Sequence, residues 1–178
     1  MKFLEWLISL FFKNQDQSAS NTILKPSLQE KKTMDDTNYK VTMKELLMGR
    51  VEFEDLEKDL QDNALELREK INKVRKALNK PMKVTSGYRS MEDHLRIYRE
   101  LAVKRKQKYD ESKVPKQSKH LYCQAVDISD PDGSLFEWTK NNESLLEEIG
   151  LWMEEKDDQK RVHFQTVSPK SGKRWFMP

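Results

Sequence analysis

A long amphipathic pattern in the middle of the chain constrains the fold more than any other sequence feature. Across residues 53–78 the apolar side chains recur at steps of three and four, which predicts one long helix with a single buried face. Asn79 and Pro81 end that pattern, because proline cannot continue a helix. The apolar positions are Phe53, Leu56, Leu60, Ala64, Leu67, Ile71, Val74 and Leu78. The rest of the domain must therefore supply an apolar surface for this helix.

Shorter segments around that helix predict a mixed architecture. Apolar residues between turn signals predict strands, and longer amphipathic stretches predict further helices. The expected strands are residues 82–86, 123–128 and 161–167, and the expected helices are residues 91–105 and one or two within 135–155. Because helices and strands do not alternate regularly, the pattern favours an α+β domain over a doubly wound sheet.

The charge balance narrows the classes of partner. Lysine and arginine number 33, and aspartate and glutamate number 30, which gives a net charge of +3. That excess is too small to indicate nucleic-acid binding, and no basic run is interleaved with aromatic residues. Cys123 is the only cysteine, so an intramolecular disulfide is impossible. We expect a monomer without a nucleic-acid partner.

The first forty residues differ in composition from the rest. Residues 1–13 are apolar apart from one narrow stripe, if they are drawn as a helix. The polar positions of that stripe are Lys2, Glu5, Ser9 and Lys13. This pattern is typical of an anchor on a membrane surface, a cleaved secretory signal or a helix that docks on a partner. Residues 14–40 predict a polar linker, and residues 41–178 one globular domain.

The histidines are the first candidates for chemistry. His94 lies on a predicted helix and is expected to be a packed or surface residue. His120 ends a loop, while Asp127 and His163 lie in strands and point into one cleft if those strands are neighbours. Two imidazoles and one carboxylate form a zinc shell that leaves a fourth position for water, although their spacing alone is not diagnostic. The same alternation places Cys123 on the face of Asp127.

Three ordered motifs carry a family resemblance. They are Thr85-Ser86-Gly87-Tyr88-Arg89-Ser90, then Ser118-x-His120 followed by Ala125-x-Asp127, then Val162-His163-Phe164. Together they resemble the signature of the zinc D-Ala-D-Ala peptidases, which include cell-wall carboxypeptidases, L-alanyl-D-glutamate endopeptidases, vancomycin-resistance dipeptidases and phage endolysins. The resemblance covers about residues 41–178. It implies a small, mostly antiparallel sheet flanked by helices, a Zn²⁺ cofactor and a peptidoglycan peptide as substrate.

The resemblance also implies a role for each matching residue. His120, Asp127 and His163 would be the zinc ligands. Arg89 would bind a substrate carboxylate or polarise the scissile carbonyl, since a guanidinium suits both tasks. A salt bridge that holds the turn is the structural alternative for Arg89. Ser118 stands just ahead of the first ligand and would contribute to substrate binding.

The chain departs from the family pattern at two places. Cys123 stands where the family usually has glycine, and its thiol would either pack inertly or approach the metal. Active members commonly carry an acidic general base two or three positions before the last histidine, but here those positions are Lys160 and Arg161. The nearest acids in sequence are Asp157 and Asp158. Either a turn brings Asp158 back to act as the base, another acid serves, or catalysis is weak or absent.

Two hypotheses follow from different classes of protein. The first is a zinc peptidase of the carboxypeptidase or murein endopeptidase type, which cleaves a bond involving a D-amino acid or the L-Ala-D-Glu link. The second is a wall-peptide-binding module of the same fold with little or no activity. A membrane-tethered scaffold that depends on residues 1–13 is a third role. We expect the protein at the cell envelope or membrane, or in the cytoplasm before release if it is phage-encoded.

Overall fold

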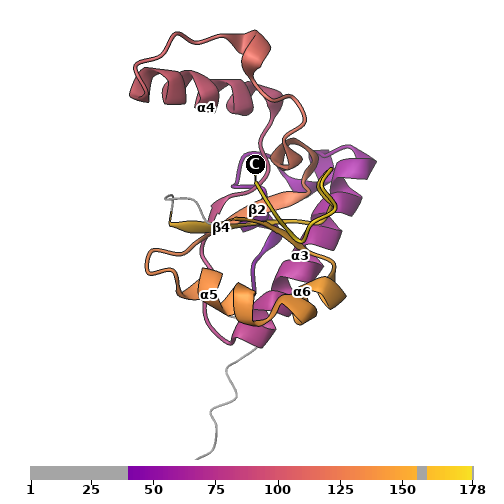
Figure 1. The fold of residues 1–178 in the computed structure, drawn as a ribbon. Coiled ribbons are helices and arrows are strands. Elements are labelled where there is room, and N and C mark those ends of the chain that lie inside the picture. Colours follow the sequence, from indigo (N-terminus) through magenta and orange to yellow (C-terminus); the bar gives the residue numbers. More distant parts are fainter. Residues whose placement is uncertain (1–39, 156–159, 178) are drawn as a thin grey trace, which may run out of the picture. The chain divides into compact units, whose positions relative to one another are not determined.

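The computed structural model describes residues 40–155 and 160–177. The predicted apolar segment at residues 1–13 and nearly all of the predicted linker at residues 14–40 lie outside the described residues. The described part is an α+β domain, as predicted, and its helices surround a five-stranded sheet (Figure 1). The helices are α2 (Met43–Leu46), α3 (Lys58–Leu78), α4 (Met91–Lys104), α5 (Ser134–Asn141) and α6 (Glu143–Ile149). The described part also contains three short 3-10 helices, which are η1 (Phe53–Asp55), η2 (Glu111–Lys113) and η3 (Lys119–Tyr122).

The sheet is mostly antiparallel, as the resemblance implied. Its strands are β1 (Val84–Ser86), β2 (Ala125–Ser129), β3 (Trp152–Glu154), β4 (Arg161–Gln165) and β5 (Trp175–Phe176). Their order across the sheet is β1-β2-β4-β3-β5, and only the pairing of β3 with β5 is parallel. The central position of β2 and β4 places two motif-bearing strands side by side.

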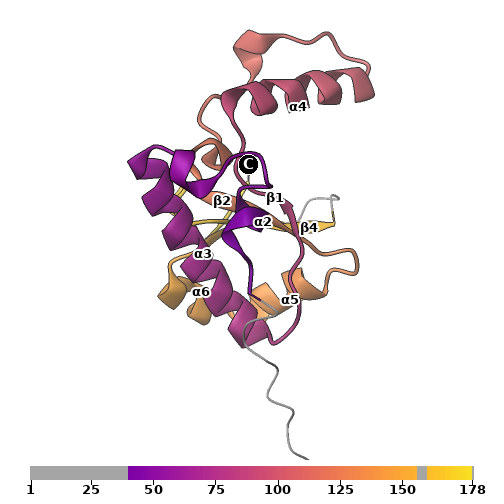
Figure 2. The same cartoon turned by 180° about the vertical axis from the view of Figure 1, so that it is seen from behind.

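Helix α3 supplies one wall of the core, in the place where the periodicity predicted a long helix. Its buried residues Leu67, Ile71 and Val74 belong to the cluster that holds Phe164 of β4 and Leu146 of α6. The helix begins later than predicted, because residues 53–55 form η1 instead. Figure 2 shows α3 lying along the back of the sheet. Within the described part, no helix is both long enough and apolar enough to cross a bilayer.

The prediction of helix up to residue 155 was wrong at its end. Gly150 adopts a left-handed conformation with φ +77° and caps α6, so the helix stops at Ile149. The following residues extend into β3, in which Met153 is fully buried and Trp152 and Glu154 are half-buried. Glu154 therefore lies on a strand beside β4 rather than on a helix.

Gly87 fixes the turn that follows β1. A side chain there is excluded, because a Cβ atom would lie 1.9 Å from the carbonyl oxygen of Leu46. The close approach lets the amide of Tyr88 donate a hydrogen bond to that oxygen at 2.8 Å. The turn thereby leads directly to Arg89, which begins the connection to α4.

Helix α4 forms an arm that stands apart from the sheet (Figures 1 and 2). Ser90 caps its start by accepting a hydrogen bond from the amide of Asp93, and the chain returns through η2 to η3. His94 is buried within this arm, and its Nε2 lies 2.8 Å from the carbonyl oxygen of Pro115. That contact joins the outgoing and returning segments, so His94 is a packed histidine, in agreement with the sequence prediction.

Candidate metal centre

Neighbouring strands bring Asp127 and His163 together. In the antiparallel pairing of β2 with β4, Asp127 is directly opposite His163, so both side chains point to the same face of the sheet. Nδ1 of His163 lies 2.8 Å from Oδ1 of Asp127. The two strands are therefore neighbours, which is the condition under which the sequence placed Asp127 and His163 together.

His120 reaches the same carboxylate from η3, which precedes β2. Its Nδ1 lies 2.8 Å from the carbonyl oxygen of Gly87, and because a carbonyl only accepts, Nδ1 carries the proton. Its other nitrogen, Nε2, then has a free lone pair and lies 3.5 Å from Oδ1 of Asp127. The tight turn at Gly87 thus selects the tautomer of His120 that can bind a metal.

The three side chains fit a zinc ion by chemistry and by spacing. One ligand atom from each of His120, Asp127 and His163 lies within 4.8 Å of the others, and all three residues are buried. Zinc bonds of about 2.0–2.1 Å in a tetrahedron place neighbouring ligand atoms roughly 3.3 Å apart, close to the separations found here. Three protein ligands leave a fourth position, which is the arrangement of catalytic zinc sites.

The ionisation states of these groups suit a cation. Burial alone would raise the pKa of Asp127, but the neighbouring imidazoles of His120 and His163 hold that pKa far below its ordinary value. Burial lowers the pKa of His120, and the neighbouring carboxylate of Asp127 only partly opposes this effect. At neutral pH the centre therefore presents a carboxylate and a neutral His120 imidazole, the forms that bind a metal.

Two arginines flank Asp127. Nη2 of Arg89 lies 3.6 Å from Oδ2 of Asp127, and its Nε and Nη2 donate to Oγ of Ser86 at 3.0 and 2.6 Å. Nη1 of Arg161 lies 2.5 Å from Oδ1 of Asp127. Burial lowers the pKa of Arg89, and the charge of Asp127 opposes that shift. The predicted site residue Arg89 is thus beside the three candidate ligands, and it also makes the salt bridge that was its structural alternative.

Of the two remaining predicted site residues, the structure describes Ser118 but not Asp158. The backbone carbonyl of Ser118 accepts the amide of Leu121 at 3.0 Å and so begins η3, while its hydroxyl does not cap that helix. Ser118 therefore helps to place His120, and its role toward a substrate stays a prediction. Asp158, the acid that the sequence put forward as general base, lies outside the described residues.

Glu154 is the acid that the sequence interpretation missed. The pairing of Met153 with Phe164 places the next residues, Glu154 and His163, opposite each other on the face that carries Asp127. Oε1 of Glu154 lies 3.9 Å from Nε2 of His163, and Oε2 lies 3.7 Å from Nη2 of Arg161. Arg161 consequently bridges Glu154 and Asp127. The glycine that ends α6 was the signal in the sequence for a strand here.

Gln165 completes the surroundings of His163. Its Oε1 lies 3.5 Å from Nε2 of His163, and its Nε2 donates to the carbonyl oxygen of Val167 at 2.5 Å. The side chain of Gln165 is therefore held in place from its far end and turns its oxygen toward the imidazole. Contacts of this kind orient a histidine so that its other nitrogen, here Nδ1, faces the metal position.

The prediction that Cys123 shares a face with Asp127 was wrong. Strand β2 begins only at Ala125, and Cys123 caps η3 in a left-handed conformation with φ 54°. Its side chain is buried in an apolar cluster with Leu47 and Leu56. Burial raises the pKa of the thiol to about 12. Cys123 is therefore an inert packing residue, which was the expected alternative to a metal contact.

The sequence that builds this site matches the model of a known protein family. The family model VanY, described as D-alanyl-D-alanine carboxypeptidase, matches residues 54–173. The matched region runs from η1 to the turn before β5 and includes all three candidate ligands together with Arg89 and Glu154. Searches of the curated proteins and of the solved structures gave no match.

Proposed function

The chain belongs to the VanY family of D-alanyl-D-alanine carboxypeptidases, and we propose that it is a zinc-dependent peptidase of peptidoglycan peptides. The observation that carries this proposal is the convergence of His120, Asp127 and His163 on one buried position. The bond cleaved involves a D-amino acid or is the L-Ala-D-Glu link. A peptidoglycan substrate places the working enzyme at the cell envelope.

Zinc is the cofactor in this proposal. Nε2 of His120, Oδ1 of Asp127 and Nδ1 of His163 would hold it, because these atoms face one another while their neighbours fix each ring and the carboxylate. Bound there, zinc would polarise the scissile carbonyl and acidify a water molecule. Arg161 touches the same oxygen of Asp127, so its guanidinium must share that carboxylate with the metal.

Arg89 is the residue that we assign to the substrate. It is held by Ser86 on one side and by Asp127 on the other, so its position is fixed before a substrate arrives. A fixed guanidinium suits the terminal carboxylate of a wall peptide, or the negative charge that develops on the carbonyl oxygen during attack. Preorganisation of this kind lowers the barrier because the donor need not reorient.

Glu154 is the described acid that we assign to proton transfer. It lies on the metal-binding face of the sheet, opposite His163, and Arg161 fixes the direction of its carboxylate. A carboxylate near the reacting water accepts its proton and later delivers one to the leaving amine. Asp158 stays the competing assignment, because it is the acid nearest to His163 in sequence.

A binding module without strong activity is the second candidate function. One observation favours it, namely that Arg161 pairs with Asp127 at a position where active relatives are expected to carry an acid. Two guanidinium groups beside Asp127 would retain carboxylate-bearing wall peptides even without hydrolysis. The two functions differ in whether a peptide bond is broken.

The test is a digest of purified muropeptides by the zinc-loaded full chain, read by mass spectrometry. A hydrolase yields a new fragment whose mass identifies the bond, and His120→Ala abolishes that fragment. Intact muropeptides, in protein shown to hold zinc, would contradict the peptidase and favour the binding module. Glu154→Gln and Asp158→Asn, assayed in parallel, identify which carboxylate transfers the proton.

A further inference from the structure

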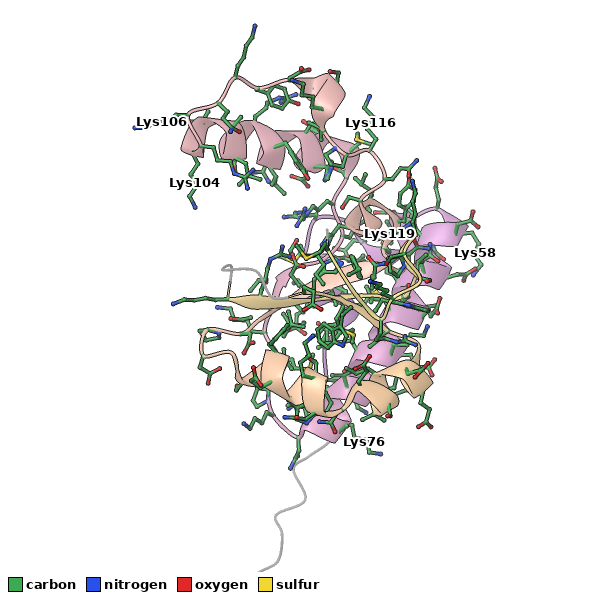
Figure 3. All side chains as sticks on the ribbon, in the orientation of Figure 1. Lys58, Lys76, Lys104, Lys106, Lys116 and Lys119 are labelled. Carbon is green, nitrogen blue, oxygen red and sulfur yellow. The ribbon has the colours of Figure 1, made fainter. Side chains whose placement is uncertain are left out.

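The arm formed by α4 carries a strongly basic end, which we call the basic tip and define as residues 103–108. Residues 101–119 hold seven lysines and arginines but only two acids, a net charge of +5. Because the full chain has a net charge of +3, all the other residues together carry −2. The positive charge of this protein is therefore concentrated on the arm. Figure 3 labels Lys104 and Lys106 at the end of α4 and Lys116 on the returning segment.

The charges of the basic tip are not compensated within the described ranges 40–155 and 160–177. Its cations are Lys104, Arg105, Lys106 and Lys108, which are all exposed. None of these four forms an ion pair with a described residue, whereas other cations on the arm do. Arg96, for example, lies 2.7 Å from Glu100 and 3.0 Å from Asp93. The basic tip is thus a cluster of like charges that no acid in the described ranges neutralises.

The helix dipole does not account for this cluster. Cations in the last turn of a helix are favourable, so Lys104 and Arg105 would stabilise the end of α4. Lys106 has already left the helix with φ 54°, and Lys108 follows two residues later. Like charges at such short spacing repel one another, and a cluster whose repulsion no described acid offsets favours an anionic partner.

The exposed apolar side chain of Val103 favours a phospholipid surface over a nucleic acid as the anionic partner. Val103 is 78% exposed and directly precedes the four cations. A single-stranded nucleic acid is usually held in a groove with stacking aromatics, but the nearby ring of Tyr109 faces Arg99 at 5.5 Å. A projecting tip with one apolar residue among lysines instead suits a phospholipid surface. There the ammonium groups meet the phosphates while the apolar side chain enters the interface.

We propose that the basic tip docks on an anionic phospholipid bilayer. Arg89 lies just before α4, and His120 lies just after the returning segment, so both ends of the arm adjoin the candidate metal centre. Docking of the tip would therefore hold that centre within about the length of α4, roughly 20 Å, of the membrane surface. The inference does not depend on zinc or on hydrolysis. It rests on the arm alone and not on residues 1–13.

Cosedimentation of the full chain with lipid vesicles tests the inference. Vesicles of phosphatidylglycerol and phosphatidylcholine in about equal parts are compared with vesicles of phosphatidylcholine alone. The tip variant changes Lys104, Lys106 and Lys108 to Gln, and a matched control changes Lys76, Lys80 and Lys83 to Gln. Both variants lose the same charge, and Lys76 lies at the opposite end of the molecule (Figure 3). Thermal melts establish that both variants fold.

The expected result is specific to the tip and to anionic lipid. Each lysine near such a surface changes partitioning roughly fivefold, so the tip variant should bind on the order of a hundredfold more weakly at low salt. The control should lose much less, and added salt should weaken the wild type. Val103→Gln should weaken binding a few-fold without changing the salt dependence.

Three outcomes would overturn the inference. Equal losses in the tip and control variants would show a response to net charge alone. Unchanged binding of the tip variant would assign membrane attachment to residues 1–13 or to no site on the arm. A wild-type chain that ignores the vesicles but sediments with a purified phosphodiester wall polymer would assign the tip to that polymer instead.

Discussion

The metal centre contains buried charges with partners, whereas the basic tip contains exposed charges without them among the described residues. At the centre, Asp127 is buried and lies within 4.0 Å of His120, His163, Arg89 and Arg161. At the tip, four cations are exposed, and no acid in the described ranges pairs with them. Burial requires that every charge have a partner, whereas exposure to water allows charges to stand unpaired.

We therefore expect stability and function to be coupled at the metal centre and independent at the basic tip. Substitutions at the centre should change stability, metal affinity and activity together, because each group there supports several others. Substitutions at the tip should change only the binding of a partner, because water already solvates those side chains.

The largest effect is expected for Asp127→Asn. The amide keeps the shape of the carboxylate but removes its charge and leaves the two arginines facing a neutral group. Zinc affinity, measured by competition with a chelator, should fall on the order of a thousandfold. Urea unfolding of the metal-free chain should show a loss of about 2–4 kcal/mol. Wild-type zinc affinity in this variant would remove Asp127 from the ligand set.

A smaller but catalytic effect is expected for Glu154→Gln. Loss of a proton acceptor should lower kcat on muropeptides by about a hundredfold or more, while zinc content stays unchanged. Glu155→Gln is the matched control, because Glu155 pairs with Lys140 at 3.2 Å, away from the centre. Equal activity of the two variants would speak against Glu154 and direct attention to Asp158.

Arg161→Gln should strengthen zinc binding. The substitution removes a cation that lies 2.5 Å from the metal-facing oxygen of Asp127 and therefore competes with zinc for its charge. We expect an increase in affinity of about tenfold in the same chelator competition. Weaker zinc binding would mean instead that Arg161 holds the carboxylate in its productive orientation.

The smallest effect on folding is expected at the basic tip. Replacing Lys104, Lys106 and Lys108 by Gln should change the free energy of unfolding by less than about 0.5 kcal/mol, since none of them has a partner in the described part of the fold. Urea denaturation beside Asp127→Asn gives the comparison directly. A loss as large as that of Asp127→Asn would erase the distinction between the two regions.

The sequence predicted those features that depend on residues close together in the chain. The three- and four-residue periodicity of α3 was visible because its buried face repeats along one helix. The three candidate ligands were found because each stands in a short motif. The partnership of Asp127 with His163 needed only the assumption that two strands are adjacent, which the structure confirms.

Long-range pairing explains what the sequence did not predict. Glu154 was assigned to a helix, and only the register of β3 against β4 brings it opposite His163. Cys123 was placed on the face of Asp127 by extending strand alternation too far, whereas a left-handed residue interrupts that alternation. The position of Arg161 on Asp127 likewise depends on cross-strand neighbours. Such contacts join residues distant in sequence and have no local signature.

In the proposed function, His120, Asp127 and His163 hold one zinc ion. The most direct test is the zinc content of the purified full chain after zinc loading and exhaustive dialysis, measured by elemental mass spectrometry beside His163→Ala and His94→Ala. We expect about one zinc per chain in the wild type and in His94→Ala, and almost none in His163→Ala. Retention of zinc by His163→Ala, or no zinc in the wild type, would contradict this assignment.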